Sequence, residues 1–423
     1  MAAPLEGIRV VDFSRVLAGP LCGRTLQDLG AEVIKIEPPG VDVARFAAPV
    51  NPNGVPGYYA QQNAGKRNIC IDLNRPEARE IALELCDQAD ILVENFRPGT
   101  LASFGLDYET LARRNPGLVY VAISGYGQGG PWRSRMAYAP TVQAEAGFTH
   151  HSLRHFGDNL QAAQTDSLSH ADVYAGLQAT IAVLAALNQR QHTGRGQFID
   201  VAMAATIMSI NERAHVDLNG LDLNDEPAIL GATDGSFFSG PGGEQLVTAI
   251  SLVGSITFRF FVTAMRRPDL AVDPRFSTPA ARRANLEALK AVVQAWIYSF
   301  PTLAALDAQF DEGKIAIGEV RPLEAIADSE WADYWGATLS VDDRNGGEFR
   351  LPGRPWKFSD AQLPLPSEPA FQGEHNRQIC TELGMDPARI DALQAGGALV
   401  GNNAAKVIAN VLGAGSMQDQ PEG

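Results

Sequence analysis

Alternating hydrophobic and polar positions organise the first part of the chain. Residues 7–13 alternate and are rich in β-branched side chains, which predicts a strand. A turn of small residues follows at 14–20, a helical pattern then runs to Leu29, and residues 31–37 form a second predicted strand. A strand, a helix and a strand in this order make a βαβ unit of a parallel sheet, and ligands of such sheets bind where strands end and helices begin.

The alternation of strand and helix continues downstream. The patterns predict a loop and strand within 63–73, a helix over 76–88, and strands over 90–94 and 118–124. Residues 136–165 follow no regular pattern. Two helices are then predicted, at 172–190 and about 201–218, with a connecting loop at 192–200. This order of elements predicts the α/β class with a doubly wound parallel sheet.

A long uncharged and mostly apolar run lies within the first of those two helices. Residues 173–187 carry no charge, and they follow Ser167 and Ser169, which are both plausible helix caps. Asp172 therefore falls in the first turn of a buried helix. An acid there is favoured by the helix dipole alone, but it is also a carboxylate held in a fixed pose. The stretch by itself leaves both explanations open.

The second half of the chain has a different composition. Residues 219–243 are rich in Gly, Asp and Asn, which indicates a linker into a second domain. A strand is predicted at 246–250 and mostly helix over 259–306, while 315–320 suggests a return to a sheet. The last twenty or so residues are expected to fray.

Composition and charge exclude several classes of partner. The 423 residues are 45% hydrophobic and 20% charged, with a formal net charge of −15. Nucleic acids and anionic membranes need a basic footprint, so neither is expected as a partner. The four cysteines are scattered without a CxxC pair, and the N-terminus lacks the pattern of a signal peptide. No uncharged apolar run reaches membrane-spanning length. We expect a soluble, cytoplasmic protein.

Basic residues nevertheless gather at loops that follow predicted strands. Such loops could form a local anion site on an acidic protein, although solvated charges are also common there. Phe96 beside Arg97 adds an aromatic surface next to a cation, a combination that suits an adenine nucleotide. The basic residues in question are Arg15, Lys66, Arg67, Arg97, Arg133 and Arg135.

Other candidate chemistry is weaker. His150, His151 and His155 follow no common zinc spacing, so a solvated loop is favoured over a metal site. His170 is interpreted as a polar neighbour of Asp172 rather than a proton shuttle, because side chains at i and i+2 do not face each other on a helix. The cysteines lack a predictable histidine partner and are interpreted as core thiols. The turn at 14–20 also lacks the GxGxxG and P-loop motifs, and the sequence has no GxSxG motif.

Taken together, the motifs resemble the family III CoA-transferases of the formyl-CoA and carnitine-CoA transferase type. The resemblance covers nearly the whole chain, and the order and spacing of the motifs are more specific than any one of them. The segments that carry it are Leu5–Pro20, Gly30–Glu37, Asn63–Arg67, Ala89–Gly99 and Thr193–Gln197.

The resemblance assigns a role to Asp172. The catalytic aspartate of the family lies four residues before a glycine and thirteen before Ala-Ala-Leu, and Asp172 has those intervals to Gly176 and to 185–187. Asp166 does not fit. The implied reaction is nucleophilic covalent catalysis, in which Asp172 attacks an acyl-CoA thioester to give an aspartyl anhydride and then an aspartyl-CoA thioester. A carboxylic acid accepts the CoA. No metal and no permanently bound cofactor are implied, since CoA is a substrate.

CoA-binding positions carry over less evenly. Leu17 stands where some members have glutamine. Pro38 and Ser103 stand where some members have basic residues, so Arg75, Arg97 or Lys66 would have to supply the missing positive charge. Tyr138 is retained, but Ala139 stands where formyl-CoA transferases carry glutamate, so oxalate and formate are not expected as substrates. The implied CoA contacts are Leu17, Ala18, Lys66, Leu73, Asn74, Arg75, Asn95, Phe96, Arg97 and Tyr138.

The resemblance also implies an architecture. A Rossmann-like large domain is expected to be interrupted by a smaller inserted α+β domain, and two chains are expected to interlock as a homodimer. The expected divisions are 1–222 for the first part of the large domain, 223–320 for the small domain with its linkers, 321–400 for the return to the large domain, and 401–423 for the tail.

Two alternative functions remain within this scaffold. An α-methylacyl-CoA racemase needs two acid/base groups, but residues 137–139 read Ala-Tyr-Ala where racemases carry a histidine. A non-catalytic protein that binds CoA esters would not need Asp172. For a transferase, Arg15, Arg213 and the histidine segment suggest a dicarboxylic acid such as succinate, malate or mesaconate.

Overall fold

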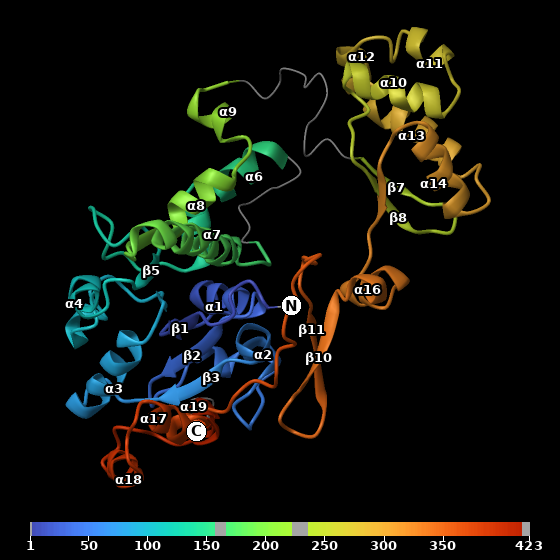
Figure 1. Cartoon of the computed structure of the whole chain (residues 1–423). Helices are drawn as coiled ribbons and strands as arrows, with labels where there is room; N and C mark the ends of the chain where they lie inside the picture. The colour runs from blue at the N-terminus through green and yellow to red at the C-terminus, as the bar shows by residue number, and fades with distance from the viewer. Residues whose placement is uncertain (1, 157–165, 222–235, 417–423) are drawn as a thin grey trace, which may run out of the picture. The chain divides into compact units, whose positions relative to one another are not determined.

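The computed structural model describes residues 2–156, 166–221 and 236–416. The chain divides into two compact units, one formed by residues 1–212 and 333–423 and the other by residues 213–332 (Figure 1). Each unit has a hydrophobic core of its own.

A six-stranded parallel sheet forms the centre of unit 1. Its strands are β1 (Arg9–Asp12), β2 (Glu32–Glu37), β3 (Arg67–Cys70), β4 (Ile91–Glu94), β5 (Val119–Ser124) and β6 (Phe198–Ala202). The spatial order is β3-β2-β1-β4-β5-β6, with Val10 of β1 paired to Val33 on one side and to Ile91 on the other. This is the doubly wound order. Strands β1 to β3 are added toward one edge of the sheet and β4 to β6 toward the other, so the switch point lies between β1 and β4. The predicted α/β class with a parallel sheet is confirmed.

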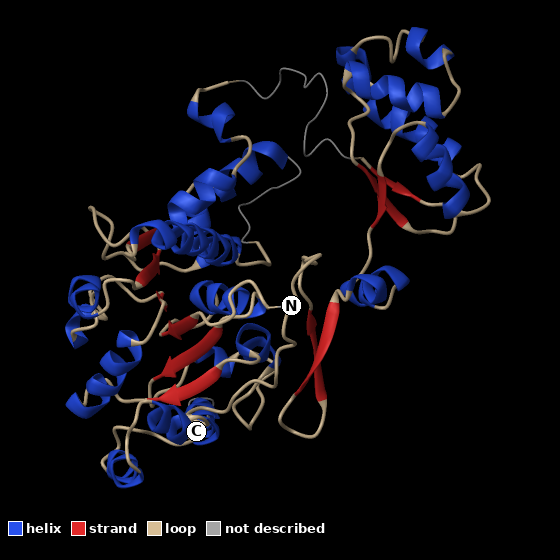
Figure 2. Cartoon of the chain, in the orientation of Figure 1, coloured by secondary structure: helices blue, strands red, loops and turns tan. Residues whose placement is uncertain are grey.

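Helices cover both faces of this sheet (Figure 2). Neighbouring strand residues point to opposite faces, so Val10 belongs to one core and Val11 to the other. The described helices of unit 1 are α1 (Ala18–Asp28), α2 (Gly57–Asn63), α3 (Pro76–Asp87), α4 (Tyr108–Arg114), α5 (Ala139–Glu145), α6 (Phe148–Phe156), α7 (His170–Thr193), α8 (Met203–Ile210), α17 (Asn376–Glu382), α18 (Pro387–Ala395) and α19 (Ala404–Ser416), with short 3₁₀ turns η1 (Val43–Phe46) and η2 (Ala102–Phe104). A hairpin of β10 (Thr338–Asp342) and β11 (Glu348–Pro352) completes the unit.

The longest helix of unit 1 is α7. By length and mean hydropathy α7 could cross a membrane. Its alanine-rich side, however, packs against α1, β5 and β6, so here it is a core helix. Its opposite side leaves Leu177 and Ile181 exposed.

Unit 2 has a three-stranded antiparallel sheet of β7 (Phe237–Ser239), β8 (Gln245–Thr248) and β9 (Ile317–Glu319). Phenylalanines and leucines of its helices fill the core. The helices are α9 (Ala214–Leu218), α10 (Ser255–Ala264), α11 (Asp269–Val272), α12 (Pro279–Ala284), α13 (Leu286–Ile297), α14 (Leu303–Glu312) and α15 (Leu323–Ala327); α16 (Glu330–Trp335) spans the boundary with unit 1.

Several local predictions were wrong. The supposed loop at 192–200 contains the start of β6, and the supposed helix at 201–218 is β6, α8 and α9. Gly196 lets β6 approach β5, because a Cβ there would lie 2.0 Å from the Leu118 carbonyl oxygen. The irregular segment after residue 136 contains α5 and α6. The sheet region predicted near 315–320 is, by contrast, confirmed by β9, which belongs to the small sheet.

The expectation of a frayed C-terminal tail was also wrong in part. Residues 404–416 form α19, and Ala404 and Ile408 are buried against the rest of unit 1. Apolar side chains at helical spacing favour such docking over fraying.

Candidate active site

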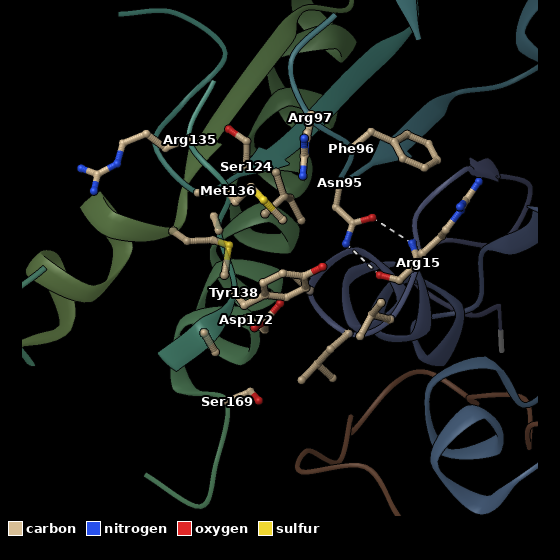
Figure 3. A pocket seen from close by; sticks show the side chains of 18 of the residues that line it. Arg15, Asn95, Phe96, Arg97, Ser124, Arg135, Met136, Tyr138, Ser169 and Asp172 are labelled. Carbon is tan, nitrogen blue, oxygen red and sulfur yellow. Dashed lines mark hydrogen bonds between the residues drawn. The ribbon is translucent and has the colours of Figure 1, made fainter. Parts of the chain in front are cut away.

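The site lies where the sheet reverses its winding. The turn after β1 and the turn after β4 meet there, and the side chain of Asn95 joins them (Figure 3). Its Oδ1 accepts the backbone N–H of Arg15 at 2.8 Å, and its Nδ2 donates to the Arg15 carbonyl at 2.8 Å. Because both turns follow the carboxyl ends of parallel strands, they open the crevice in which doubly wound folds bind ligands.

Asp172 enters this crevice from the first turn of α7. The helix begins after Ser169, whose side chain makes no capping hydrogen bond. Burial raises the pKa of the Asp172 carboxyl to about 6, although hydrogen bonds from the backbone N–H groups of Ala18 and of Asp172 itself oppose that rise. A carboxylate with such a pKa is ionised at neutral pH but is more basic, and so more nucleophilic, than an ordinary aspartate.

Gly176 explains the spacing that singled out Asp172. A Cβ at Gly176 would lie 2.5 Å from the carbonyl oxygen of Ala18, so only glycine allows α7 to approach the start of α1 this closely. Residues 172 and 176 lie one turn apart on the same side of α7. The N–H of Ala18 binds Asp172 while its carbonyl faces Gly176.

A cavity of about 500 Å³ opens in front of Asp172. Its lining contains four arginines and a single carboxylate, that of Asp172. Arg135 is paired with Glu145. The other three arginines of the lining give this cavity positive charge, although the protein as a whole is acidic. The lining residues are Arg15, Val16, Leu17, Ala18, Tyr58, Asn95, Phe96, Arg97, Pro98, Ile123, Ser124, Gly125, Arg133, Arg135, Met136, Ala137, Tyr138, Ala139, Pro140, Ser169, Asp172 and Met203.

Arg15 lies between this cavity and a second one of about 350 Å³. Its guanidinium lies 5.0 Å from the centre of the Phe96 ring, and its Nε is buried without a hydrogen-bond partner. Burial lowers the pKa of Arg15, while Asp42 and Glu37 act in the opposite direction. An unsatisfied cation at the junction of two cavities is suited to an anionic group of a ligand that occupies both.

Most of the residues that line the second cavity are apolar, among them Leu73, Phe96 and Phe104, and the amide of Asn74 adds polar groups. Phe96 and Arg15 line both cavities, so the two are contiguous. A flat ring with polar edges, such as a nucleobase, matches this combination of aromatic, aliphatic and amide side chains.

Most of the residues singled out from the sequence come together at these cavities. Leu17, Ala18, Asn95, Phe96, Arg97, Tyr138 and Asp172 line the first, and Leu73, Asn74 and Phe96 line the second.

Two of the implied CoA contacts lie in neither cavity. Arg75 lines a separate recess together with Glu77, Glu80 and Arg389. Lys66 is buried inside the sheet, where its Nζ pairs with Asp12 at 2.8 Å. Burial lowers the pKa of Lys66 to about 8, against the attraction of Asp12. The ammonium of Lys66 is thus paired with a carboxylate inside the protein. Because Lys66 lines neither cavity, it is not proposed as a CoA contact.

The structure adds residues that the sequence did not indicate. Tyr58 of α2 lines the first cavity, and burial raises the pKa of its hydroxyl, with a further contribution from Asp172. Ser124 ends β5, and its buried Oγ has no hydrogen-bond partner. The end of a predicted strand is a weak signal for Ser124, whereas no pattern in the sequence points to Tyr58.

None of the described histidines and cysteines lines the cavity that contains Asp172. His150 and His151 are on α6 and neither lines the cavity; the side chain of His155 is outside the described residues. His170 contacts Asp166, with Nε2 and Oδ2 3.1 Å apart. Cys22, Cys70, Cys86 and Cys380 are all buried free thiols. Within residues 2–156, 166–221 and 236–416, no three potential ligands gather into a metal site.

A doubly wound fold with a partly buried carboxylate at its switch point is typical of α/β enzymes. Residues 5–376 match the family described as CoA-transferase family III. The chain belongs to CoA-transferase family III, and it is an enzyme that transfers CoA.

Individual relatives are similar along almost their whole length. A succinyl-CoA–D-citramalate CoA-transferase of Chloroflexus aurantiacus is 31% identical, with 93% of this chain and 97% of the relative covered. A formyl-CoA:oxalate CoA-transferase of Streptomyces coelicolor is 30% identical over 94% of this chain and 100% of the relative. A CAIB/BAIF family protein of Brucella suis has a solved structure with a TM-score of 0.75 and 30% identity, covering 90% of this chain and 100% of that one.

Proposed function

We propose that the enzyme exchanges CoA between two carboxylic acids with Asp172 as a covalent nucleophile. The observation that carries the proposal is the partly buried Asp172 carboxylate, with a pKa of about 6, at a cavity lined by arginines. Its elevated basicity supports attack on a thioester, and the basic lining supports binding of anionic substrates.

The steps balance without an external reagent. An Asp172 oxygen attacks the thioester carbonyl carbon, the C–S bond breaks, and CoA thiolate and an acyl–aspartyl anhydride remain. The thiolate attacks the aspartyl carbonyl, which releases the first carboxylate and leaves an aspartyl-CoA thioester. The acceptor carboxylate then attacks this thioester and expels CoA thiolate, which attacks the new acyl carbonyl and frees Asp172.

Uncharged hydrogen-bond donors near Asp172 support these steps. The N–H of Ala18 binds the carboxylate in the free enzyme, and it is placed to follow the charge that develops on the aspartyl oxygen. The hydroxyl of Ser124 is buried beside the same cavity and has no partner. Donors that need no rearrangement at the moment of reaction contribute several kcal/mol to acyl transfer, of the order of 3 kcal/mol for one donor.

CoA is proposed to occupy both cavities. The nucleobase fits the second cavity beside Leu73, Asn74 and Phe96, and the thioester arm reaches Asp172 through the first. Arg15 and Arg97 then meet phosphate groups near the junction. The remaining proposed contacts are Leu17, Ala18, Asn95 and Tyr138.

The acids are proposed to be dicarboxylic. Leu17, Met136 and Met203 give the first cavity an apolar part, and Arg15 and Arg133 give it charge. A short carbon chain with a carboxylate at each end matches this arrangement, since one carboxylate meets Asp172 and the other an arginine. The name of one relative, which includes succinyl-CoA and D-citramalate, supports an acid of this kind.

We also propose the homodimer and an inserted small domain, which the second compact unit, residues 213–332, supports with wider bounds than the 223–320 expected from the sequence. Exposed Leu177, Ile181 and Met208 lie on the neighbouring helices α7 and α8, and a second chain that covers them would remove apolar surface from water. Sizing by light scattering at micromolar and nanomolar concentrations tests this proposal. A species of 45 kDa, the mass of one chain, at both concentrations would refute it.

Trapping the intermediate tests the mechanism. The enzyme is incubated with succinyl-CoA and each of a panel of carboxylic acids, hydroxylamine is added, and peptides are analysed by mass spectrometry. The proposal expects a hydroxamate at Asp172 and a new acyl-CoA with a dicarboxylic acid. Asp172→Asn should abolish both products. Asp166→Asn, a nearby exposed carboxylate paired with His170, should retain them. Modification of any residue but Asp172 would disprove the mechanism.

A further inference from the structure

The turn that presents Ala18 to Asp172 contains a strained residue. Val16 has a backbone φ of +67°. The left-handed region is unfavourable for any residue with a Cβ, and especially for a β-branched one. Such conformations persist only where surrounding groups enforce them, and they gather at functional sites. Val16 is two residues before Ala18, so its conformation directs the chain into the first turn of α1.

The carboxylate of Asp42 holds this turn. Its Oδ1 accepts the backbone N–H of Val16 at 3.1 Å and that of Ala44 at 3.0 Å. Asp42 is fully buried, and it follows another strained valine, Val41, with φ +60°. The Ala44 N–H in η1 therefore holds the Asp42 carboxylate in place, and the carboxylate accepts one backbone N–H, that of Val16, from the turn after β1.

Lys35 of β2 completes the support. Its Nζ pairs with Asp42 Oδ2 at 3.0 Å and donates to the carbonyl of Ser14 at 2.8 Å. Burial acts to lower the pKa of Lys35, but Asp42, Asp12 and Glu37 outweigh it and the pKa is raised, so the side chain is charged. Lys35 and Asp42 thus bind the turn at both ends of the Ser14–Val16 segment, one through a carbonyl and the other through an N–H.

A buried ion pair is a poor source of stability. The cost of removing two charges from water commonly equals or exceeds their attraction, and a well-packed apolar pair would serve the core as well. The hydrogen bonds made by this pair instead go to peptide groups of the turn. Its chemistry suits the fixing of one backbone conformation better than the filling of a core.

We propose that Asp42 and Lys35 are positioning residues, which hold Val16 in its left-handed conformation so that the Ala18 N–H faces Asp172. This inference rests on the proposed nucleophilic role of Asp172. Neither side chain lines the cavity, so neither touches substrate, and both act through the backbone of residues 14–18.

The test measures acylation of Asp172 in a single turnover. Asp42→Asn keeps the size of the side chain but turns an amide NH₂ toward the Lys35 ammonium or toward the Val16 N–H. We expect at least a tenfold slower appearance of the Asp172 adduct from succinyl-CoA, with less than a twofold change in the concentration that gives half the maximal rate. Lys35→Met should produce the same loss, and it serves if Asp42→Asn does not fold.

A second change separates positioning from a general loss of stability. Glycine adopts φ near +67° without a steric cost, so in Val16→Gly residue 16 needs less support from Asp42 to keep its left-handed conformation. We expect the double variant Val16→Gly/Asp42→Asn to acylate at least fivefold faster than Asp42→Asn alone. Asp28→Asn is the matched control, because Asp28 is also a buried carboxylate, paired with Arg24 and Arg354, and does not contact the turn. It should acylate at the wild-type rate.

Each outcome decides the matter. A wild-type rate in Asp42→Asn, or a double variant no faster than Asp42→Asn, overturns the positioning role while the proposed function stands. A rate loss in Asp28→Asn equal to that in Asp42→Asn overturns it as well, because the effect would then follow from any buried ion pair. A wild-type enzyme that forms no adduct overturns the proposed function and this inference with it.

Discussion

Replacement of Asp172 by asparagine should make the protein more stable, by an amount that grows with pH. Burial raises the pKa of the carboxyl from 3.8 to about 6, so the folded state binds its proton more tightly than the unfolded state. Below pH 3.8 the carboxyl is protonated in both states and costs nothing. Above pH 6 it is ionised in both, and the folded state carries the full cost of burying the charge.

The magnitude follows from the two pKa values. Each pH unit between them corresponds to about 1.4 kcal/mol, so the full cost is about 3 kcal/mol above pH 6. At pH 5 the unfolded carboxyl is already mostly ionised while the folded one is mostly protonated, which accounts for about 1.6 kcal/mol. Asparagine is of equal size and still accepts the Ala18 N–H, and its own contribution does not vary with pH. The advantage of the variant should thus increase by about 1.4 kcal/mol from pH 5 to pH 8.

Urea unfolding of both proteins, at several pH values between 5 and 8, measures this advantage. The comparison uses the change in the difference between the proteins, so that other titrating groups cancel. A difference that is constant across this range would show that Asp172 has an ordinary pKa, and the argument for an activated carboxylate would then fail. The assay needs no knowledge of the substrates.

Three further predictions concern the site and the core. Single-turnover acylation should fall about tenfold per pH unit below pH 6 and level off above it, because only the ionised Asp172 attacks; a flat profile measured by quench and mass spectrometry would contradict this. Gly176→Ala should lower the free energy of unfolding by about 1–3 kcal/mol and slow acylation, since its Cβ meets Ala18; Gly129→Ala, with open space around it, should do neither. Burial raises the pKa of Cys22 to about 12, and all four thiols are buried, so native protein should react with no equivalents of a thiol reagent at pH 8 and denatured protein with four.

The sequence predicted the central strands because their burial is simple. The strands β1, β2, β4 and β5 are covered on both faces, and their runs of valine, isoleucine and leucine are therefore nearly continuous. The edge strand β6 lacks this signal, because Phe198 and Asp200 are exposed and the strand is identified only by its pairing with Tyr120 and Ala122. A short strand that is defined by its partner cannot be recognised from its own residues.

Candidate site residues divide in the same way. The role of Asp172 was predicted through the resemblance, because the intervals to Gly176 and to residues 185–187 that carry it are local to one helix. Lys66 was misplaced because its partner, Asp12, lies 54 residues away, and such a pairing leaves no trace in either segment. The distinction between a cation that waits for a ligand and one already neutralised inside the protein depends on contacts that only the fold creates.

The close packing of α1 on α7 has a consequence for how substrate preference can change. The proposed nucleophile and the N–H donor beside it are held by two helices in contact through Gly176, whereas Arg133, Met136 and Tyr138 belong to the connection between β5 and α5. Part of the proposed acid pocket is thus encoded apart from the helix pair that holds Asp172. Exchange of residues 126–138 between homologous enzymes would offer a route to new acids, since that helix pair need not be redesigned.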